Sequence, residues 1–259
     1  QKRALVDQIA AAGYIPESVD VAESMYADSG SPIDGLIVVE RLAQLGELER
    51  ANTLLERIEV EQGDTDDDYL RYLLSLSRGA VSSMEGRAAL DNLAKLDSRI
   101  AKLQNSGDSE GLRQVTAELD QTKADAVGKL KQGVEALREV DTSSRARLTP
   151  KIRMHNLLKL QVMLDNDDSL KAEILDNARQ AVDLDPVNWT AVQCLMQAHL
   201  IMANPSEALS VVDQYFRRGG MAQPARASIM EVARLEGKPG LAIPSLERAM
   251  ERDPSNSIW

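Results

Sequence analysis

Between Met84 and Asp141, hydrophobic residues recur at spacings of four and three, a pattern typical of a narrow coiled-coil seam. A polar stretch with two glycines, Asn105–Gly111, interrupts the seam and has the composition of a turn. We therefore predict two long antiparallel helices, which either project from the rest of the chain or lengthen one helix pair within it. The seam residues are Ala89, Leu93, Leu96, Ile100 and Leu103 in the first arm and Leu112, Val115, Leu119, Val127, Leu130, Val134 and Leu137 in the second.

Residues 170–259 contain a different pattern, which repeats after 34 positions. Apolar character is kept between Leu195 and Ile229 and between Leu209 and Ile243, while Met196 pairs with Met230. At twice that offset, "QAVDLDP" (180–186) resembles "RAMERDP" (248–254). Each unit is predicted to be a helix, a short turn and a second helix, followed by a boundary that contains proline.

Prolines set these boundaries, because proline lacks an amide donor and disfavours helical geometry in the residue before it. Small residues, Ala208 and Ala242, stand where two antiparallel helices would cross closely. The predicted helix ends are at Asn204-Pro205, Lys238-Pro239, Asp185-Pro186 and Asp253-Pro254, with Asn188 and Ser257 as caps of the next helices.

In these features residues 170–259 resemble tetratricopeptide (TPR) repeats, helix-turn-helix units that stack into a right-handed superhelix. The matching positions are Leu195 and Ile229 at the first-helix leucine, Ala208 and Ala242 at the mid-unit alanine, Ala181 and Ala249 at the second-helix alanine, and Pro186 and Pro254 at the late proline. The departures are Val192 and Arg226 at the usual tryptophan, Met196 and Met230 at a usual small residue, and Gly219-Gly220 in place of Asp-Pro.

The N-terminal part has the same outline over Asp34–Asp64, with Leu42, Gly46, Ala51, Leu55 and Ile58 at the family spacing, and a helix over 68–78 would open the next unit. The fold class is therefore expected to be all-α, a TPR-like solenoid of antiparallel helix pairs with a long helical hairpin in the middle. We expect N-terminal repeats over 1–80, the hairpin over 84–141 and C-terminal repeats over 145–259.

Composition and charge narrow the range of partners. The net charge is −11, which disfavours duplex nucleic acid and anionic membranes and leaves a basic peptide as a partner. No apolar run is long enough to cross a bilayer. Cys194 is the only cysteine, so there is no internal disulfide. The compartment is left open: the cytoplasm is favoured, with the cell envelope as the alternative if an N-terminal signal or anchor was removed.

Catalytic motifs are missing from the sequence. His155 and His199 are the only histidines and have no metal-binding spacing, and no phosphate-binding loop or serine-hydrolase motif occurs. We expect His199 to pack between helices, His155 to be solvated and Cys194 to be buried as a small hydrophobic residue. The chain is therefore predicted to be non-catalytic and to bind no cofactor.

Two acidic clusters, "GDTDDD" (63–68) and "DNDDS" (165–169), raise the question of calcium. Neither completes an EF-hand loop, because Tyr69 and Leu170 stand at the glycine position and Ser75 and Asp176 at the glutamate position. Turns that cap helices account for both clusters, so no metal site is expected.

The resemblance implies a concave groove lined by the first helix of each unit, which would bind an extended peptide or a partner helix. Chaperone-binding members of the family hold a C-terminal carboxylate with Lys, Asn and Arg, which are missing at the corresponding positions here. We therefore expect a basic or neutral peptide. The groove residues would be Thr190, Gln193, Gln197, Ala227, Glu231 and Arg234.

Two other functions stay open. The chain could self-associate as an assembly subunit, through the 84–141 hairpin or the end at Trp259, where a new repeat would begin. Alternatively, it could be a regulatory or substrate-recruiting region of a larger enzyme.

Overall fold

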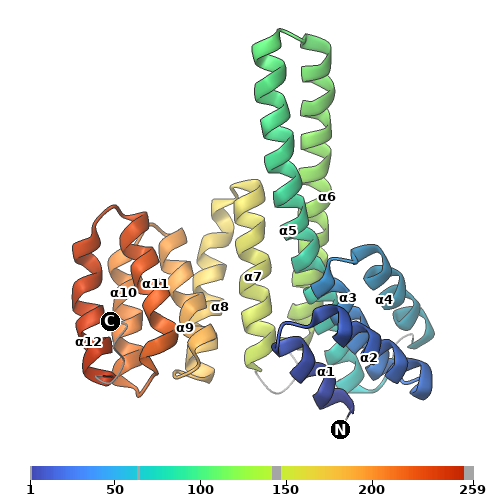
Figure 1. Ribbon diagram of the computed structural model, residues 1–259, viewed down its shortest axis with the longest axis horizontal. Helices are drawn as coiled ribbons and strands as arrows, with labels where there is room; N and C mark the ends of the chain where they lie inside the picture. Colours follow the sequence, from blue (N-terminus) through green and yellow to red (C-terminus); the bar gives the residue numbers. More distant parts are fainter. Residues whose placement is uncertain (1, 63–64, 142–146, 254–259) are drawn as a thin grey trace. The chain divides into compact units, whose positions relative to one another are not determined.

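The computed structural model describes residues 2–62, 65–141 and 147–253, which form helices and turns without any strand (Figure 1). The chain divides into two compact units: the first comprises α1 to α6, and the second comprises most of α7 together with α8 to α12. From α1 to α6 and from α8 to α12, each helix packs on its neighbour in chain order. The prediction of an all-α solenoid of helix pairs with a long hairpin is confirmed.

The first unit is built around α3, which packs against α2, α4 and α5. Gly46 ends α3 in the left-handed conformation, with φ of 88°. The residues expected at repeat spacing, Leu42, Ala51, Leu55 and Ile58, are all buried. The helices are α1 (Lys2–Ala11), α2 (Ile15–Ser29), α3 (Pro32–Leu45), α4 (Leu48–Gln62), α5 (Asp68–Ser106) and α6 (Ser109–Asp141).

A buried carboxylate links α1, α2 and α3. Asp34, near the start of α3, accepts hydrogen bonds from Arg3 Nε at 2.6 Å and from Ser29 Oγ at 2.7 Å. Burial raises the pKa of Asp34, but these hydrogen bonds and the charge of Arg3 outweigh it, and the pKa is lowered overall. The first helix is therefore attached to the core by a polar contact as well as by Val6.

The predicted hairpin consists of α5 and α6, with Gly107 in the turn at φ of 75°. Its first arm begins earlier than expected. We predicted a short helix over 68–78 and a separate arm from Met84, but α5 runs without a break from Asp68 to Ser106. One end of this helix packs on α3 and α4, so the hairpin lengthens a helix pair of the first unit.

Two glycines let the arms of the hairpin approach closely. A Cβ atom on Gly79 would lie 3.0 Å from Leu137 Cδ1, and one on Gly86 would lie 2.8 Å from Leu130 Cδ2. Leu130 and Leu137 are fully buried as a result. The two glycines and the two leucines each stand seven residues apart, so they meet along one seam.

The second unit consists of short helices joined by tight turns. Pro205 begins α10, Pro239 begins η2, and the Asn188 side chain accepts hydrogen bonds from the Thr190 and Ala191 amides at the start of α9, as predicted. The predicted boundary at Pro254 and the positions Asn256, Ser257 and Trp259 lie outside the described residues. The elements are α7 (Leu148–Asp165), η1 (Asp168–Leu170), α8 (Lys171–Leu184), α9 (Trp189–Ile201), α10 (Pro205–Arg217), α11 (Ala222–Leu235), η2 (Pro239–Ala242) and α12 (Ile243–Arg252).

Small side chains mark the helix contacts in this unit. Ala181, Ala208, Ala242 and Ala249 are buried, as small residues between packed helices would be. The unexpected Gly219-Gly220 pair has a packing reason, because a Cβ atom on Gly220 would lie 2.3 Å from Tyr215 Cζ. The Tyr215 ring is thereby buried between Trp189, at a centroid distance of 5.3 Å, and Phe216, at 5.7 Å.

Candidate partner-binding surfaces

The residues expected to line a groove lie on two neighbouring helices of the second unit. Thr190, Gln193 and Gln197 belong to α9, and Ala227, Glu231 and Arg234 to α11, and these two helices contact each other. Spacings of three and four place each set on one side of its helix. All but Gln193 and Gln197, which are partly buried, have exposed side chains. We call these six residues the α9–α11 surface.

Gln197 also contacts α7, the first helix of the preceding helix pair. Lys159 Nζ of α7 donates a hydrogen bond to Gln197 Oε1 at 2.9 Å. This bond fixes the amide oxygen of Gln197 and places a cationic group beside it. A partner that uses Gln197 has to approach next to Lys159.

Glu231 and Arg234 form a pair within one turn of α11. Arg234 Nε donates to Glu231 Oε2 at 2.7 Å, and Nη2 donates to Oε1 at 2.6 Å. These hydrogen bonds lower the pKa of Glu231 and raise that of Arg234. The pair is neutral in sum, so the negative charge of Glu231 is already matched on its own helix.

The prediction that His155 is solvated was wrong, because its side chain is fully buried. Neither ring nitrogen has a hydrogen-bond partner among the described residues. Burial lowers the pKa of His155 to about 4, and the positive charge of Lys159 acts in the same direction. The residue is therefore a neutral imidazole in the core of the second unit.

Cys194 and His199 are buried, as predicted. Burial raises the pKa of the Cys194 thiol to about 11, which keeps it protonated and unreactive. Burial also lowers the pKa of His199. Neither side chain combines the exposure and the charge state that a nucleophile or general base requires.

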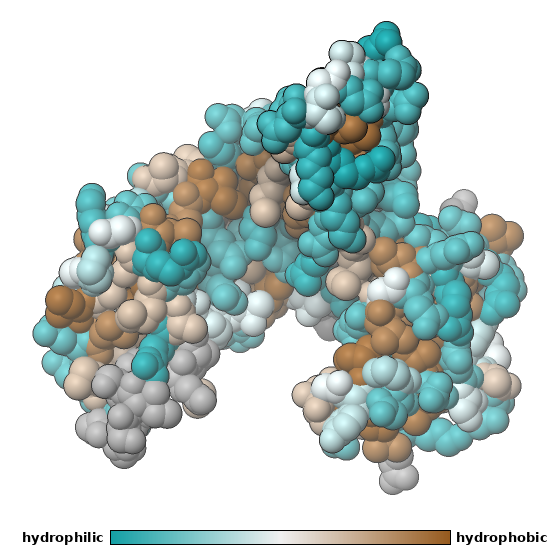
Figure 2. All heavy atoms as spheres, turned by 45° about the horizontal axis from the view of Figure 1, so that its top comes forward, coloured by the Kyte–Doolittle hydropathy of each residue, from teal (hydrophilic) through white to brown (hydrophobic). Residues whose placement is uncertain are grey.

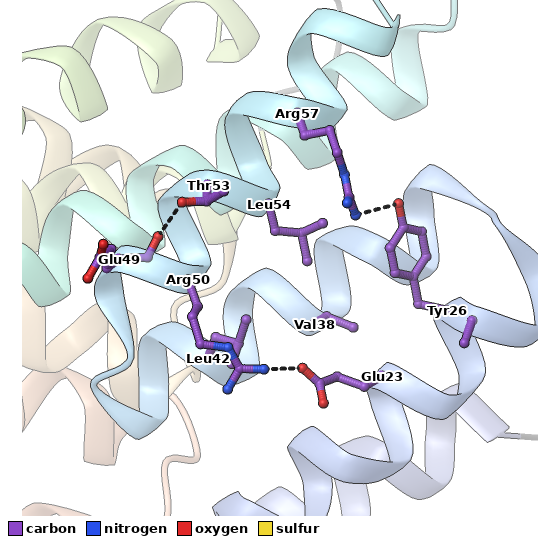
Figure 3. A pocket seen from close by; sticks show the side chains of 10 residues that line it. Glu23, Tyr26, Val38, Leu42, Glu49, Arg50, Thr53, Leu54 and Arg57 are labelled. Atoms are coloured by element: carbon purple, nitrogen blue, oxygen red, sulfur yellow. Dashed lines mark hydrogen bonds and ion pairs between the residues drawn. The ribbon is translucent and has the colours of Figure 1, made fainter.

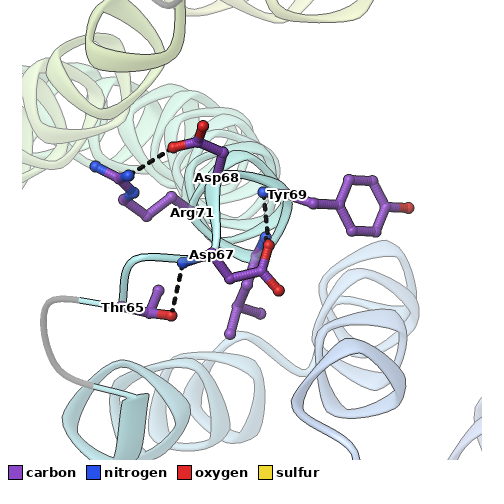
Figure 4. Close-up of polar contacts among 6 residues, drawn as sticks. Thr65, Asp67, Asp68, Tyr69 and Arg71 are labelled. Atoms are coloured by element: carbon purple, nitrogen blue, oxygen red, sulfur yellow. Dashed lines mark hydrogen bonds and ion pairs between the residues drawn. The ribbon is translucent and has the colours of Figure 1, made fainter.

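The two acidic clusters cap helices, as expected. Asp67 accepts hydrogen bonds from the amides of Tyr69 and Leu70 at the start of α5, and Asp68 pairs with Arg71 at 2.6 Å (Figure 4). Asp167 accepts from the Ser169 amide at the start of η1. Within the described parts of the chain, no three His, Cys, Asp or Glu side chains gather in a way that could hold a metal ion.

A groove that the sequence did not predict lies in the first unit between α2 and α4, above α3 (Figure 3). Its volume is about 740 Å³, within the range of roughly 300 to 1,000 Å³ typical of ligand sites. Its lining combines apolar side chains with charged ones at the rim: Glu23, Tyr26, Ala27, Val38, Leu42, Glu49, Arg50, Thr53, Leu54 and Arg57. We call it the α2–α4 groove.

The surroundings of this groove are more apolar than the surface of the hairpin. In the view of Figure 2, apolar side chains gather over helices α1 to α4, whereas polar side chains cover most of the visible hairpin. Two further grooves between α4 and the hairpin have mixed charges, such as the ion pair of Glu59 with Arg78 and that of Glu85 with Lys129 at 2.7 Å. Because these charges are paired with each other, they favour neither an acidic nor a basic ligand.

No helix among the described residues is both long and apolar enough to span a lipid bilayer. No family model matches the sequence, and no curated protein matches it. Among solved structures, the chain is similar to the TPR2AB-domain:pHSP90 complex of yeast Sti1, with 14% identity, a TM-score of 0.30 and coverage of 97% of this chain and 96% of that one. A TM-score this low supports no inference about function.

Proposed function

We propose that this chain is a non-catalytic protein–protein interaction scaffold that holds a partner peptide or helix against the α9–α11 surface. One observation supports this role: α9 and α11, the first helices of two successive helix pairs, contact each other and present a row of small and polar side chains. Of these side chains, Thr190, Ala227, Glu231 and Arg234 are exposed. Helices that pack on each other bind at little ordering cost, because the surface exists before the partner arrives.

The partner's chemistry follows from charge. The chain as a whole carries −11, which attracts basic segments at long range. At the surface itself Glu231 is matched by Arg234. We therefore propose a neutral or basic segment, whose affinity depends on contact with the small side chains as well as on charge.

A binding role is also supported by the state of the residues that catalysis would need. His155 and Cys194 are buried, and burial holds the imidazole neutral and the thiol protonated. These side chains serve packing, which leaves the exposed polar surface as the functional part of the second unit.

The test is a pull-down with the intact chain, comparing two variants of the pair. The first is Glu231→Arg, which replaces the neutral pair by two positive charges, and the second is the swap of Glu231→Arg with Arg234→Glu, which keeps the pair neutral. We expect Glu231→Arg to reduce the capture of specific partners at least about fivefold and the swap to retain much of it. As a control, Glu247→Arg makes the same charge change at an exposed position of α12. Capture that is unchanged by Glu231→Arg would contradict the proposal.

Self-association is a second candidate, favoured by one observation on α12. Ile243 and Met250, seven residues apart on this helix, are 55% and 47% exposed. Light scattering over a range of concentrations tests it: a dimer that Ile243→Ser with Met250→Ser abolishes supports it, and a monomer at every concentration excludes it.

A further inference from the structure

The α2–α4 groove is crossed by two polar bridges with an apolar floor between them (Figure 3). Arg50 Nη2 of α4 contacts Glu23 Oε1 of α2 at 2.5 Å, and Arg57 Nη2 donates to the Tyr26 hydroxyl at 3.3 Å. The floor consists of Val38 and Leu42 of α3 and Leu54 of α4. Val38 and Leu42 are each only 2% exposed, so the partly buried Leu54 is the part of the floor that an inserted side chain would contact. The side chains of α2 and α4 that meet across the groove stand in the way of a whole helix.

The two ends of the groove carry opposite charges that have at most a loose ion pair. At one end Arg57 has only a loose ion pair with Glu61 at 3.9 Å, and its guanidinium lies 5.9 Å from the centre of the Tyr26 ring. At the other end Glu49 is exposed, and its carboxylate makes no hydrogen bond or ion pair within the described parts of the chain. By contrast, the charges in the middle of the groove are paired with one another, since Arg50 contacts both Glu23 and Glu47.

The spacing of these charges matches that of an extended peptide. Glu49 and Arg57 are eight residues apart on one helix, which corresponds to about 12 Å along its axis. In an extended chain, residues i, i+2 and i+4 point to the same side, and i and i+4 are separated by about 13 Å. Along the axis of α4, a basic side chain at i and an acidic one at i+4 therefore match the positions of Glu49 and Arg57, whose directions around the helix differ by about 80°, while the side chain at i+2 lies over the floor.

We propose that the α2–α4 groove binds an extended segment of a partner protein with the pattern basic, any residue, aliphatic, any residue, acidic. The aliphatic side chain packs between the two bridges on Leu54, next to the nearly buried Val38 and Leu42, the basic one pairs with Glu49, and the acidic one pairs with Arg57. The charges fix the direction of the segment along α4. This surface adds a second contact to the proposed scaffold, and it belongs to a different unit from the α9–α11 surface.

The proposal is tested with the acetylated and amidated peptide Gly-Lys-Ser-Leu-Ser-Glu-Gly, added to the intact chain and followed by NMR chemical-shift changes. We expect shifts around Val38, Leu42 and Leu54 that saturate with peptide. Replacing the peptide leucine by serine should abolish them, and either Arg57→Glu or Glu49→Lys should weaken binding about fivefold. Both positions are exposed, and circular dichroism checks that the variants keep their helices.

A charge exchange makes the test specific. The reversed peptide Gly-Glu-Ser-Leu-Ser-Lys-Gly should bind poorly to the native chain and regain affinity for the double variant Glu49→Lys with Arg57→Glu. Glu56→Lys makes the same charge change at an exposed position of α4 outside this groove and should leave binding unchanged. The absence of binding, or equal binding of both peptides to the native chain, would overturn the proposal. So would tighter binding of a helical peptide with Lys, Leu and Glu four residues apart.

The outcome is independent of the α9–α11 surface. Variants of Glu49 and Arg57 leave Glu231 and Arg234 intact, so a groove that fails this test can coexist with a scaffold that passes its own.

Discussion

The long hairpin and the short helix pairs bring antiparallel helices together in different ways. In the hairpin, Gly79 and Gly86 of α5 receive Leu137 and Leu130 of α6, so large side chains fill spaces opposite glycines. In the second unit, buried alanines such as Ala181 and Ala208 stand at the contacts. α10, for example, packs against α9, α11 and α12.

This difference separates two sources of stability. Towards its tip, the hairpin has one narrow seam between two helices, so each leucine along it counts heavily. A short pair shares its buried surface with neighbouring helices and tolerates polar groups such as His155, Lys151 and Asn177 in its interior. Asn177 Nδ2, for instance, donates to the Lys151 carbonyl oxygen at 2.7 Å.

The largest expected effect is a loss of stability of the second unit at acid pH. The pKa of His155 is about 4 in the folded chain, against 6.5 for the unfolded one. The unfolded state therefore binds the proton first, and stability present above pH 6.5 is lost as the pH falls towards 4, by about 3 kcal/mol. Urea unfolding followed by Trp189 fluorescence at pH 7 and pH 4.5 measures the loss.

The matched variant for this prediction is His155→Leu, which removes the titrating group from the same site. In this variant, most of the difference in unfolding free energy between the two pH values should disappear. A smaller part should remain because burial also lowers the pKa of His199. An unchanged pH dependence in His155→Leu would show that His155 does not titrate on unfolding in this way.

The next effect tests the seam of the hairpin. Gly86→Leu places a large side chain where a Cβ atom alone would lie 2.8 Å from Leu130 Cδ2, and we expect a loss of about 2 kcal/mol in the free energy of unfolding. Gly128→Ala on α6 is the control, because nothing lies within 4 Å of its Cβ position. This change should stabilise the helix by roughly 0.5 to 1 kcal/mol. Equal effects of the two substitutions in thermal unfolding would contradict the close packing of the arms.

The smallest expected effect concerns the side chains that cap the start of one helix in each unit. Asp67 caps α5 and Asn188 caps α9, each by accepting two backbone hydrogen bonds. Asp67→Ala and Asn188→Ala should each cost about 1 kcal/mol. Hydrogen exchange should show the loss in the first turn of the altered helix and in its own unit. A loss that appears only in the other unit would be inconsistent with local capping.

Features that depend on neighbours in the sequence could be predicted. The caps at Asn188 and Asp67, the seam through Leu96 and Leu130, and the buried Ala208 all follow from local spacing and side-chain size. The family resemblance also implied the positions of the α9–α11 surface, although its role in binding stays a prediction.

Features that need helices distant in sequence could not be predicted. His155 lies near a Thr-Pro start, and only the packing of the second unit buries it. The α2–α4 groove requires side chains from three helices, including the contact of Glu23 with Arg50. The continuity of α5 past Gly79 and Gly86 belongs here too, since the side chains beside these glycines are leucines of α6, which is distant in sequence.

The most direct test of the scaffold role is site-specific photo-cross-linking in the intact chain. A photoreactive amino acid at Gln193 or Ala227 lies on the α9–α11 surface. One at Gln214 lies at an exposed position of α10, which is the second helix of its pair and does not belong to that surface. We predict that a captured partner is cross-linked from positions 193 and 227 but not from 214. Cross-links of equal yield from all three positions, or from 214 alone, would contradict the central claim that the first helices hold the partner.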